Sequence, residues 1–168
     1  MFDNEAFRHD LLRPSLIAIN MYSENAEELL IATMAHESLG GTYLKQTKGP
    51  ALGVFQMEPA TYDDMWNHYI GNDVPLMKSI LNACQYLQRP PAAHLTWNLR
   101  LATIMARVYY YRVRPPLPIK SDLDAIWLYY KNYWNTQVGS ATKDAFVKNY
   151  YRFVGKKGEK LPAQVEAV

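Results

Sequence analysis

"MAHESLGGTYLKQTKGPALGVFQMEP", Met34–Pro59, joins the end of an apolar helix to a loop that is interrupted by glycines. Glu37 lies close to the end of that helix, immediately before the break at Gly40-Gly41. Three residues lie within about 40° of Glu37 around the helix axis and belong to its inward-facing stripe: Ala26, Leu30 and Thr33. Glu37 continues this stripe, and a charge placed there is costly unless it is paired, protonated or used in chemistry.

The position of Glu37 predicts a raised carboxyl pKa. Burial disfavours the charged form, and the helix macrodipole disfavours a negative charge at a C-terminus. A general acid that works near neutral pH needs such a pKa. The alternative is a structural glutamate paired with an arginine. The following loop favours the catalytic interpretation, because Gly40-Gly41 turn the chain sharply and "GVFQM" offers Gln56 as a neutral hydrogen-bonding group beside the acid.

Composition indicates an ordinary globular domain. The chain has 168 residues, of which 49% are hydrophobic and 20% charged, and a net charge of +2 is too small to indicate a nucleic-acid partner. Cys84 is the single cysteine, so no internal disulfide can form, and we expect it to be a small core residue. The N-terminus lacks the pattern of a secretory signal, and no segment is apolar over the length of a membrane span. We therefore expect synthesis in the cytoplasm, no membrane insertion and export by another route.

The pattern of apolar residues and breaks predicts a mainly helical domain over residues 1–154, followed by a polar, flexible tail over 155–168. Asn25 with Glu28, and Thr61 with Asp64, are typical of helix N-terminal caps. The segment 41–57 loses the helical period and is expected to form a small β-hairpin or an extended loop. Helices are expected over 15–22, 25–38, 61–69, 74–87, 97–113, 122–134 and 142–153.

Other catalytic chemistries fit the sequence less well. His36-Glu37 begins like the zinc motif His-Glu-x-x-His, but Gly40 occupies the position of the second histidine. The remaining histidines show no ligand spacing, and the chain has neither a Gly-x-Ser-x-Gly elbow nor a phosphate-binding glycine loop. We therefore expect no metal and no cofactor.

Two linked motifs resemble those of the lytic transglycosylases of the lysozyme superfamily, particularly the forms carried by bacteriophages. That family has a Glu-Ser pair at a helix end, matched here by Glu37-Ser38. A Gly-Ala-x-Gly-Leu-Met-Gln segment follows in the family. "PALGVFQM", Pro50–Met57, is similar to it, with Ala51, Gly53 and Gln56 in place and a separation from Glu37 very close to the family's.

The family's third motif, Ala-Tyr-Asn on a later helix, has no literal match. "AIWLYYKNYWNTQVGSAT", residues 125–142, lies where that motif is expected. We assign the tyrosine of that motif to Tyr130, with Lys131 in place of the asparagine. Tyr129 and Tyr133 are the alternatives. These tyrosines could equally be packing residues of the helix.

The resemblance implies an α+β lysozyme-like fold, in which a helical domain and a small β-hairpin lobe flank a glycan-binding groove. It implies cleavage of the β-1,4 bond between N-acetylmuramic acid and N-acetylglucosamine in peptidoglycan. Glu37 would be the general acid and then the base, with Ser38, Gln56 and Tyr130 supporting it or binding substrate. Transglycosylases of this type need no second carboxylate, because the 6-hydroxyl of the sugar closes a 1,6-anhydro ring.

A hydrolase would instead need a second carboxylate near Glu37. Glu58 and Asp63 are the candidates, and both are interpreted mainly as structural residues. The resemblance also implies a setting: a bacteriophage lysis protein or a virion component that acts on the periplasmic cell wall, with peptidoglycan strands and tail or other virion proteins as partners. The competing hypothesis is a non-catalytic virion protein that keeps the lysozyme-like fold.

Overall fold

The computed structural model describes residues 1–136 and 139–155, and this part of the chain is mainly helical. The N-terminal helix runs through three consecutive pieces, which are α1 (Asn4–Ala6), the π-helical η1 (Phe7–Leu12) and α2 (Arg13–Ala18). The longer helices that follow are α3 (Glu24–Glu37), α4 (Pro59–His68), α5 (Val74–Cys84), α6 (Leu99–Tyr111), α7 (Leu123–Tyr130) and α8 (Lys143–Val154). The short ones are η2 (Ile70–Asn72), η3 (Ala92–Thr96) and η4 (Lys131–Asn135).

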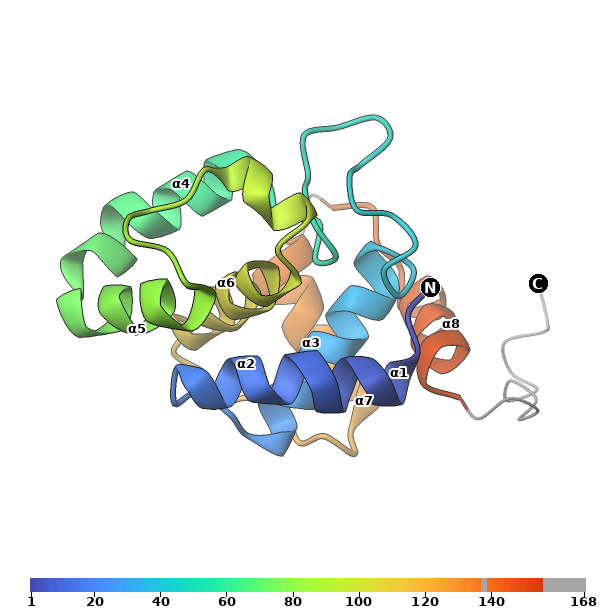
Figure 1. Ribbon diagram of the computed structural model, residues 1–168. Coiled ribbons are helices and arrows are strands. Elements are labelled where there is room, and N and C mark those ends of the chain that lie inside the picture. The colour runs from blue at the N-terminus through green and yellow to red at the C-terminus, as the bar shows by residue number, and fades with distance from the viewer. Residues whose placement is uncertain (137–138, 156–168) are drawn as a thin grey trace.

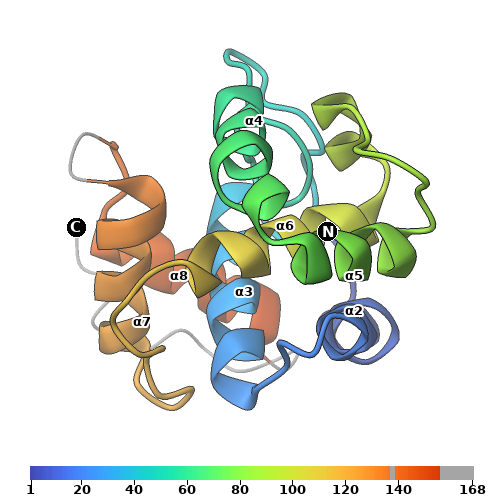
Figure 2. The same cartoon turned by 90° about the vertical axis from the view of Figure 1, so that its left-hand side faces the viewer.

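Helix α3 is the central element of the fold. It contacts α6, α7 and α8 as well as η1, and Figures 1 and 2 show it in the middle of the molecule with the other helices around it. An uninterrupted run of α3, from Leu29 to Ala35, is buried. A helix that is buried on all sides needs apolar or internally satisfied residues around its whole circumference. The polar exception is Thr33, whose hydroxyl donates to the Leu29 carbonyl oxygen at 2.8 Å.

Two glutamates at the start of α3 tie it to its neighbours. Glu27 is buried and receives hydrogen bonds from Arg8 at 3.2 Å and from Arg13 at 2.9 Å. Glu28 pairs with Arg8 and accepts a 2.6 Å bond from the Tyr150 hydroxyl of α8. Burial works to raise the pKa of Glu27, but the two arginines outweigh it and hold that pKa below its ordinary value. These contacts fix the helix that ends at Glu37.

The segment 41–57 forms an extended loop. It is closed by two isolated antiparallel bridges, Lys45 with Leu52 and Leu52 with Met57, and the structure describes no paired strands there. Gly53 has a φ of +74°, and a Cβ atom built on it would lie 2.4 Å from the Leu95 carbonyl oxygen of η3. Only glycine fits this approach. Of the two forms expected from the sequence, the extended loop is the one present. Its backbone hydrogen bonds fold the loop back on itself, and Gly53 packs against η3.

The expected capping box of α3 was wrong. Ser23 is the N-cap, and its hydroxyl accepts a 3.1 Å bond from the amide of Ala26. Asn25 lies inside the first turn, and its side chain accepts from the Lys120 amide at 2.9 Å. The Glu28 carboxylate instead contacts Arg8 and the Tyr150 hydroxyl. Ser23 was equally suitable as a cap, and the long-range partner of Asn25 could not be known from local sequence.

The expected cap of α4 was also wrong. The helix begins at Pro59, which needs no amide hydrogen in the first turn, and Glu58 is the N-cap without a side-chain bond. Thr61 is therefore inside the helix. Asp64 pairs with Arg112 at 3.2 Å and with His68 at 3.0 Å, so its carboxylate does not cap anything.

The N-terminal helix begins much earlier than the expected 15–22. Asp3 caps it by accepting from the Ala6 amide at 2.9 Å, and it ends at Ala18. Proline lacks an amide hydrogen and its ring crowds the carbonyl four residues earlier. The π-helical η1 directly precedes Pro14, and this widened turn lets the helix continue where the sequence favoured a start.

The remaining helices lie close to their expected positions. Their starts are fixed by side-chain caps that accept from the amide three residues later: Asp73, Asn98, Asp122 and Thr142. Cys84 is buried, as expected. The expected tail, apart from Gly155, lies outside the described residues. Over the described part of the chain, every helix is too short or too polar to cross a membrane.

Candidate active site

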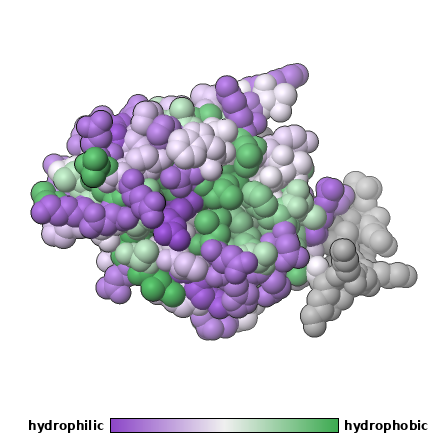
Figure 3. Space-filling model, in the orientation of Figure 1, coloured by the Kyte–Doolittle hydropathy of each residue, from purple (hydrophilic) through white to green (hydrophobic). Residues whose placement is uncertain are grey.

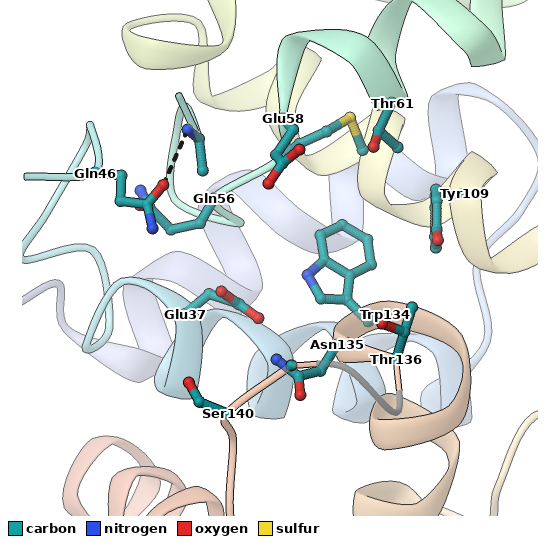
Figure 4. A pocket seen from close by; sticks show the side chains of 13 residues that line it. Glu37, Gln46, Gln56, Glu58, Thr61, Tyr109, Trp134, Asn135, Thr136 and Ser140 are labelled. Atoms are coloured by element: carbon teal, nitrogen blue, oxygen red, sulfur yellow. Dashed lines mark hydrogen bonds between the residues drawn. The ribbon is translucent and has the colours of Figure 1, made fainter. Parts of the chain in front are cut away.

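A cleft of about 570 Å³ lies beside the C-terminal end of α3. Figure 4 shows three segments around it, and each contributes polar side chains. The end of α3 supplies Glu37, the loop that leads into α4 supplies Gln56 and Glu58, and η4 supplies Trp134 and Asn135. Segments that are distant in sequence therefore meet around one carboxyl group.

Glu37 is partly buried and holds a carboxyl group at the cleft wall. The Tyr130 hydroxyl donates a 2.6 Å hydrogen bond to its Oε1 atom. Burial raises the pKa of Glu37 from 4.5 to about 7, although hydrogen bonds from Tyr130 and Trp134 act in the opposite direction. No arginine or lysine is among the groups that shift this pKa. Within residues 1–136 and 139–155, Glu37 therefore lacks the arginine partner that the structural alternative required.

Tyr130 is the tyrosine that reaches the acid, among the three considered. It is fully buried, and its ring packs against Phe146 and Trp127 at centroid distances of 4.8 and 5.9 Å. Tyr129 instead donates its hydroxyl to the Pro115 carbonyl, and Tyr133 stacks on Tyr129. Burial and the neighbouring carboxyl raise the pKa of Tyr130, so its hydroxyl stays a proton donor.

Trp134 is a site residue that sequence reasoning missed. It lines the cleft, and Figure 4 shows its indole nitrogen on the side that faces Glu37. Its ring is held by Tyr109 and Phe55, at centroid distances of 4.9 and 6.5 Å. A signal was present, because Trp134 follows Tyr130 by four residues and residues at that spacing share a helix face.

Gln56 lies where the resemblance implied, on the loop wall of the cleft. Its Nε2 group donates to the Gly53 carbonyl at 2.7 Å and to the Tyr43 carbonyl at 3.4 Å. Its φ of +50° is unusual for a residue with a side chain. Such a conformation persists only where surrounding contacts hold it, so Gln56 fixes the loop as well as facing the cleft.

Ser38 does not face the cleft. Its side chain is fully buried, donates to the Met34 carbonyl at 3.2 Å and accepts from the Gly41 amide at 2.9 Å. Ser38 therefore holds the turn at Gly40 and Gly41, whose φ angles of +65° and +80° suit glycine. Of the two roles expected for Ser38, support of the acid or substrate binding, these contacts favour support, because both hydrogen-bonding functions of the hydroxyl are used within the turn.

The two candidate second carboxylates are placed differently. Glu58 is exposed and lines the cleft, and Figure 4 shows its carboxylate on the wall across from Glu37. Asp63, on α4, pairs with Arg89 from the segment that follows α5, and it is not among the described residues of the cleft wall. Lys131, at the position of the family's asparagine, donates 2.7 Å bonds to Asn135 and to the Gly139 carbonyl, and so shapes the turn below the cleft.

The chemistry available in this cleft is proton transfer by one carboxyl group. A carboxyl with a pKa near 7 is protonated in a large fraction of molecules at neutral pH, which suits a general acid. Within the described ranges, no three histidine, cysteine, aspartate or glutamate side chains are grouped closely enough to hold a metal ion. Comparison with protein-family models, with characterised proteins and with solved structures produced no significant match.

Glu37→Gln should stabilise the fold at alkaline pH. The folded carboxyl keeps its proton up to about pH 7, whereas an ordinary glutamate loses it near 4.5. The free energy of unfolding of the wild-type protein therefore falls as pH rises between these values. The variant lacks this loss, because its amide does not ionise. Allowing for partial exposure, the variant should gain about 2–3 kcal/mol at pH 8 relative to wild type and almost nothing at pH 4.

Urea unfolding of both proteins at pH 4, 6 and 8 measures this difference. Titrations of all other groups cancel in the comparison. A variant that is equally or less stable than wild type at pH 8 would show that the Glu37 carboxylate is not strained by its surroundings.

Proposed function

We propose that this protein cleaves the β-1,4 bond between N-acetylmuramic acid and N-acetylglucosamine in peptidoglycan. The observation that carries the proposal is Glu37, a carboxyl with a raised pKa at a polar cleft and in hydrogen-bond contact with Tyr130. The Glu37-Ser38 and Pro50–Met57 motifs add the resemblance to lytic transglycosylases. A β-hairpin lobe is part of that resemblance, and the bridged loop 41–57 would take its place as one wall of the groove.

The reaction begins with proton donation by Glu37 to the glycosidic oxygen. The bond from the anomeric carbon to that oxygen breaks, its electron pair goes to the departing N-acetylglucosamine, and positive charge develops on the muramic acid ring. The 6-hydroxyl of the same ring then attacks the anomeric carbon and gives its proton to the Glu37 carboxylate. Glu37 is thereby restored, and no water is consumed.

Tyr130 and Trp134 support the charged form of Glu37 between these two steps. A carboxylate in a poorly hydrated site needs hydrogen-bond donors. The Tyr130 hydroxyl donates one at 2.6 Å, and the Trp134 indole N–H faces the same carboxyl group. The Tyr130 bond also fixes the orientation of the carboxyl group before the reaction. Both groups lower the pKa of Glu37, but by less than burial raises it, so the acid remains protonated for the first step.

Ring closure is favoured over hydrolysis in this proposal. The 6-hydroxyl belongs to the bound sugar and loses little entropy when it attacks. Hydrolysis would need a second carboxylate to hold water or to stabilise the cationic ring. Glu58 is the one candidate that lines the cleft, but it is exposed at the start of α4 and has no hydrogen-bonding partner within the described chain that would fix its carboxylate.

The biological setting follows from the resemblance to bacteriophage-borne forms. We place the activity in cell-wall penetration or lysis, with glycan strands as the substrate and tail or other virion proteins as assembly partners. The protein would act at the periplasmic wall. The alternative, a virion protein that keeps the fold without activity, is decided by the experiment below.

Glu37→Gln should abolish cleavage while leaving the protein folded. The substitution removes the transferable proton and preserves the shape of the side chain, so the rate should fall by at least about 10²–10⁴. The assay is release of soluble muropeptides from purified peptidoglycan. Glu24→Gln is the matched control, because Glu24 lies on the same helix, is exposed and pairs with Lys120 away from the cleft.

Near-normal activity of Glu37→Gln would remove Glu37 from the mechanism. Absence of release by the folded wild-type protein, tested from pH 5 to 8, would favour the non-catalytic virion protein instead.

The products should carry 1,6-anhydro-N-acetylmuramic acid ends. Ring closure leaves the summed mass of the products equal to that of the strand, whereas hydrolysis adds one water at each cleaved bond. Mass spectrometry of the digest distinguishes these outcomes, and a chelator should leave the activity intact. Reducing ends throughout the digest would contradict ring closure, and loss of that activity in Glu58→Gln would then identify the second carboxylate.

A further inference from the structure

A second hollow of about 350 Å³ adjoins the cleft on the side of the loop 41–57. Glu37, Gln46 and Gln56 line both spaces, so the hollow continues the cleft beyond the acid. Its other walls are Tyr43, Lys45, Thr47 and Lys48. We refer to this second hollow as the lysine compartment.

The two spaces differ in charge. Among the described residues, the main cleft is lined by Glu58 as a second carboxylate and by neither lysine nor arginine. The described lining of the lysine compartment includes Lys45 and Lys48, and its acidic group is the shared Glu37. Both lysines are exposed, and neither forms an ion pair with any residue in the ranges 1–136 and 139–155. A surface that presents cations without counter-charges favours an anionic ligand.

The loop that carries these lysines is held by its own hydrogen bonds. The Gln46 amide donates to the Ala51 carbonyl at 2.9 Å, and the Gln46 side chain accepts from the Ala51 amide at 3.2 Å. The Gly53 amide also donates to the Leu44 carbonyl at 2.9 Å. Figure 3 shows this loop as a hydrophilic projection at the top of the molecule. The lysines are therefore presented at a defined place beside Glu37.

We propose that the lysine compartment binds a carboxylate of the peptide stem that peptidoglycan carries on its muramic acid residues. This inference rests on the proposed function. The N-acetylated sugar rings are uncharged, so the anionic groups of this substrate are those of its peptides. An ammonium group is a point charge on a flexible stem and tolerates varied geometry, which suits a mobile peptide. The stem would lie beside Glu37 because the muramic acid that bears it is the sugar undergoing reaction.

The test compares two preparations of soluble, labelled glycan strands. One bears peptide stems; from the other an amidase has removed them, and the lactyl carboxylates that this frees on muramic acid have been converted to neutral methylamides. Affinity is measured by fluorescence anisotropy in a Glu37→Gln background, where the proposal expects no cleavage during titration. The double variant Lys45→Gln/Lys48→Gln should bind peptide-bearing strands about three- to tenfold more weakly, because each screened ion pair contributes a few-fold. Its affinity for the peptide-free strands should equal that of its parent. Added salt should reduce the difference in affinity between the double variant and its parent on peptide-bearing strands.

Lys78→Gln is the matched control, because Lys78 is an exposed lysine on α5 and lines neither space. It should leave both affinities unchanged. Circular dichroism melting of each variant establishes that it is folded. Equal affinities of the double variant and its parent for peptide-bearing strands would overturn the inference. An equal loss on both kinds of strand would also overturn it, because the lysines would then recognise the glycan itself.

The binding result is separate from the fate of the proposed function. If the wild-type protein binds peptide-bearing strands through the lysines but releases no muropeptides, the binding inference stands and the catalytic proposal fails. If the wild-type protein cleaves both kinds of strand and the double variant has an unchanged KM on the peptide-bearing kind, the catalytic proposal stands and the lysine compartment has no role in peptide recognition.

Discussion

The hydrogen bond from the Tyr130 hydroxyl to the Glu37 carboxyl joins two helix ends that are 93 residues apart in sequence. Glu37 ends α3 at a position where both burial and the helix dipole act against a negative charge. Without a donor, this carboxyl would have no fixed orientation in its protonated form and little support in its ionised form. Tyr130 supplies that donor from a fully buried position. The arrangement of α3, α7 and α8 can be understood as the framework that keeps the two groups in contact.

Contacts at both ends of α3 hold Glu37 in position to accept the hydrogen bond from Tyr130. At the start of α3, the buried Glu27 with Arg8 and Arg13 fixes the helix against the N-terminal segment. At its end, Ser38 holds the glycine turn that leads into the cleft loop. Breaking a buried ion pair by removing one partner is strongly destabilising, so the network around Glu27 also limits how far α3 can shift. The position of the carboxyl group thus depends on interactions at both ends of α3, at Glu27, about three turns before Glu37, and at Ser38, the residue directly after it.

Part of the site was predictable from sequence, because the relevant patterns are local. Helical periodicity placed Glu37 on the inward stripe, and the glycine and proline breaks marked the following loop as irregular. The resemblance led to Gln56 and to Tyr130, and the structure places the former at the cleft and the latter on the acid. The stripe and the breaks are local features, which sequence patterns describe well, whereas Gln56 and Tyr130 were chosen by comparison with the motifs of a family.

The remainder depends on contacts between distant segments. The caps of α3 and α4 were wrong because Asn25 and Asp64 bind partners far away in the chain. Ser38 was expected either to support the acid or to bind substrate, and its hydroxyl forms its hydrogen bonds within the turn that follows Glu37. The contribution of η4 to the cleft wall was missed because helical spacing places Trp134 on the face of Tyr130 but does not show which distant segments that face meets. The lysine compartment exists because the loop folds back beside Glu37, and no local pattern encodes that approach.

The central claim is that Glu37 is a carboxyl with its proton affinity raised by the fold. Selective isotope labelling of glutamate, with Glu37→Gln used to assign the resonance, allows the carboxyl carbon of Glu37 to be followed by NMR from pH 3 to 9. We expect a titration midpoint near 7, well above the ordinary value of 4.5. A midpoint at or below 4.5 in the folded protein would contradict it, since such a carboxyl would be ionised at neutral pH and could not donate a proton to a glycosidic oxygen.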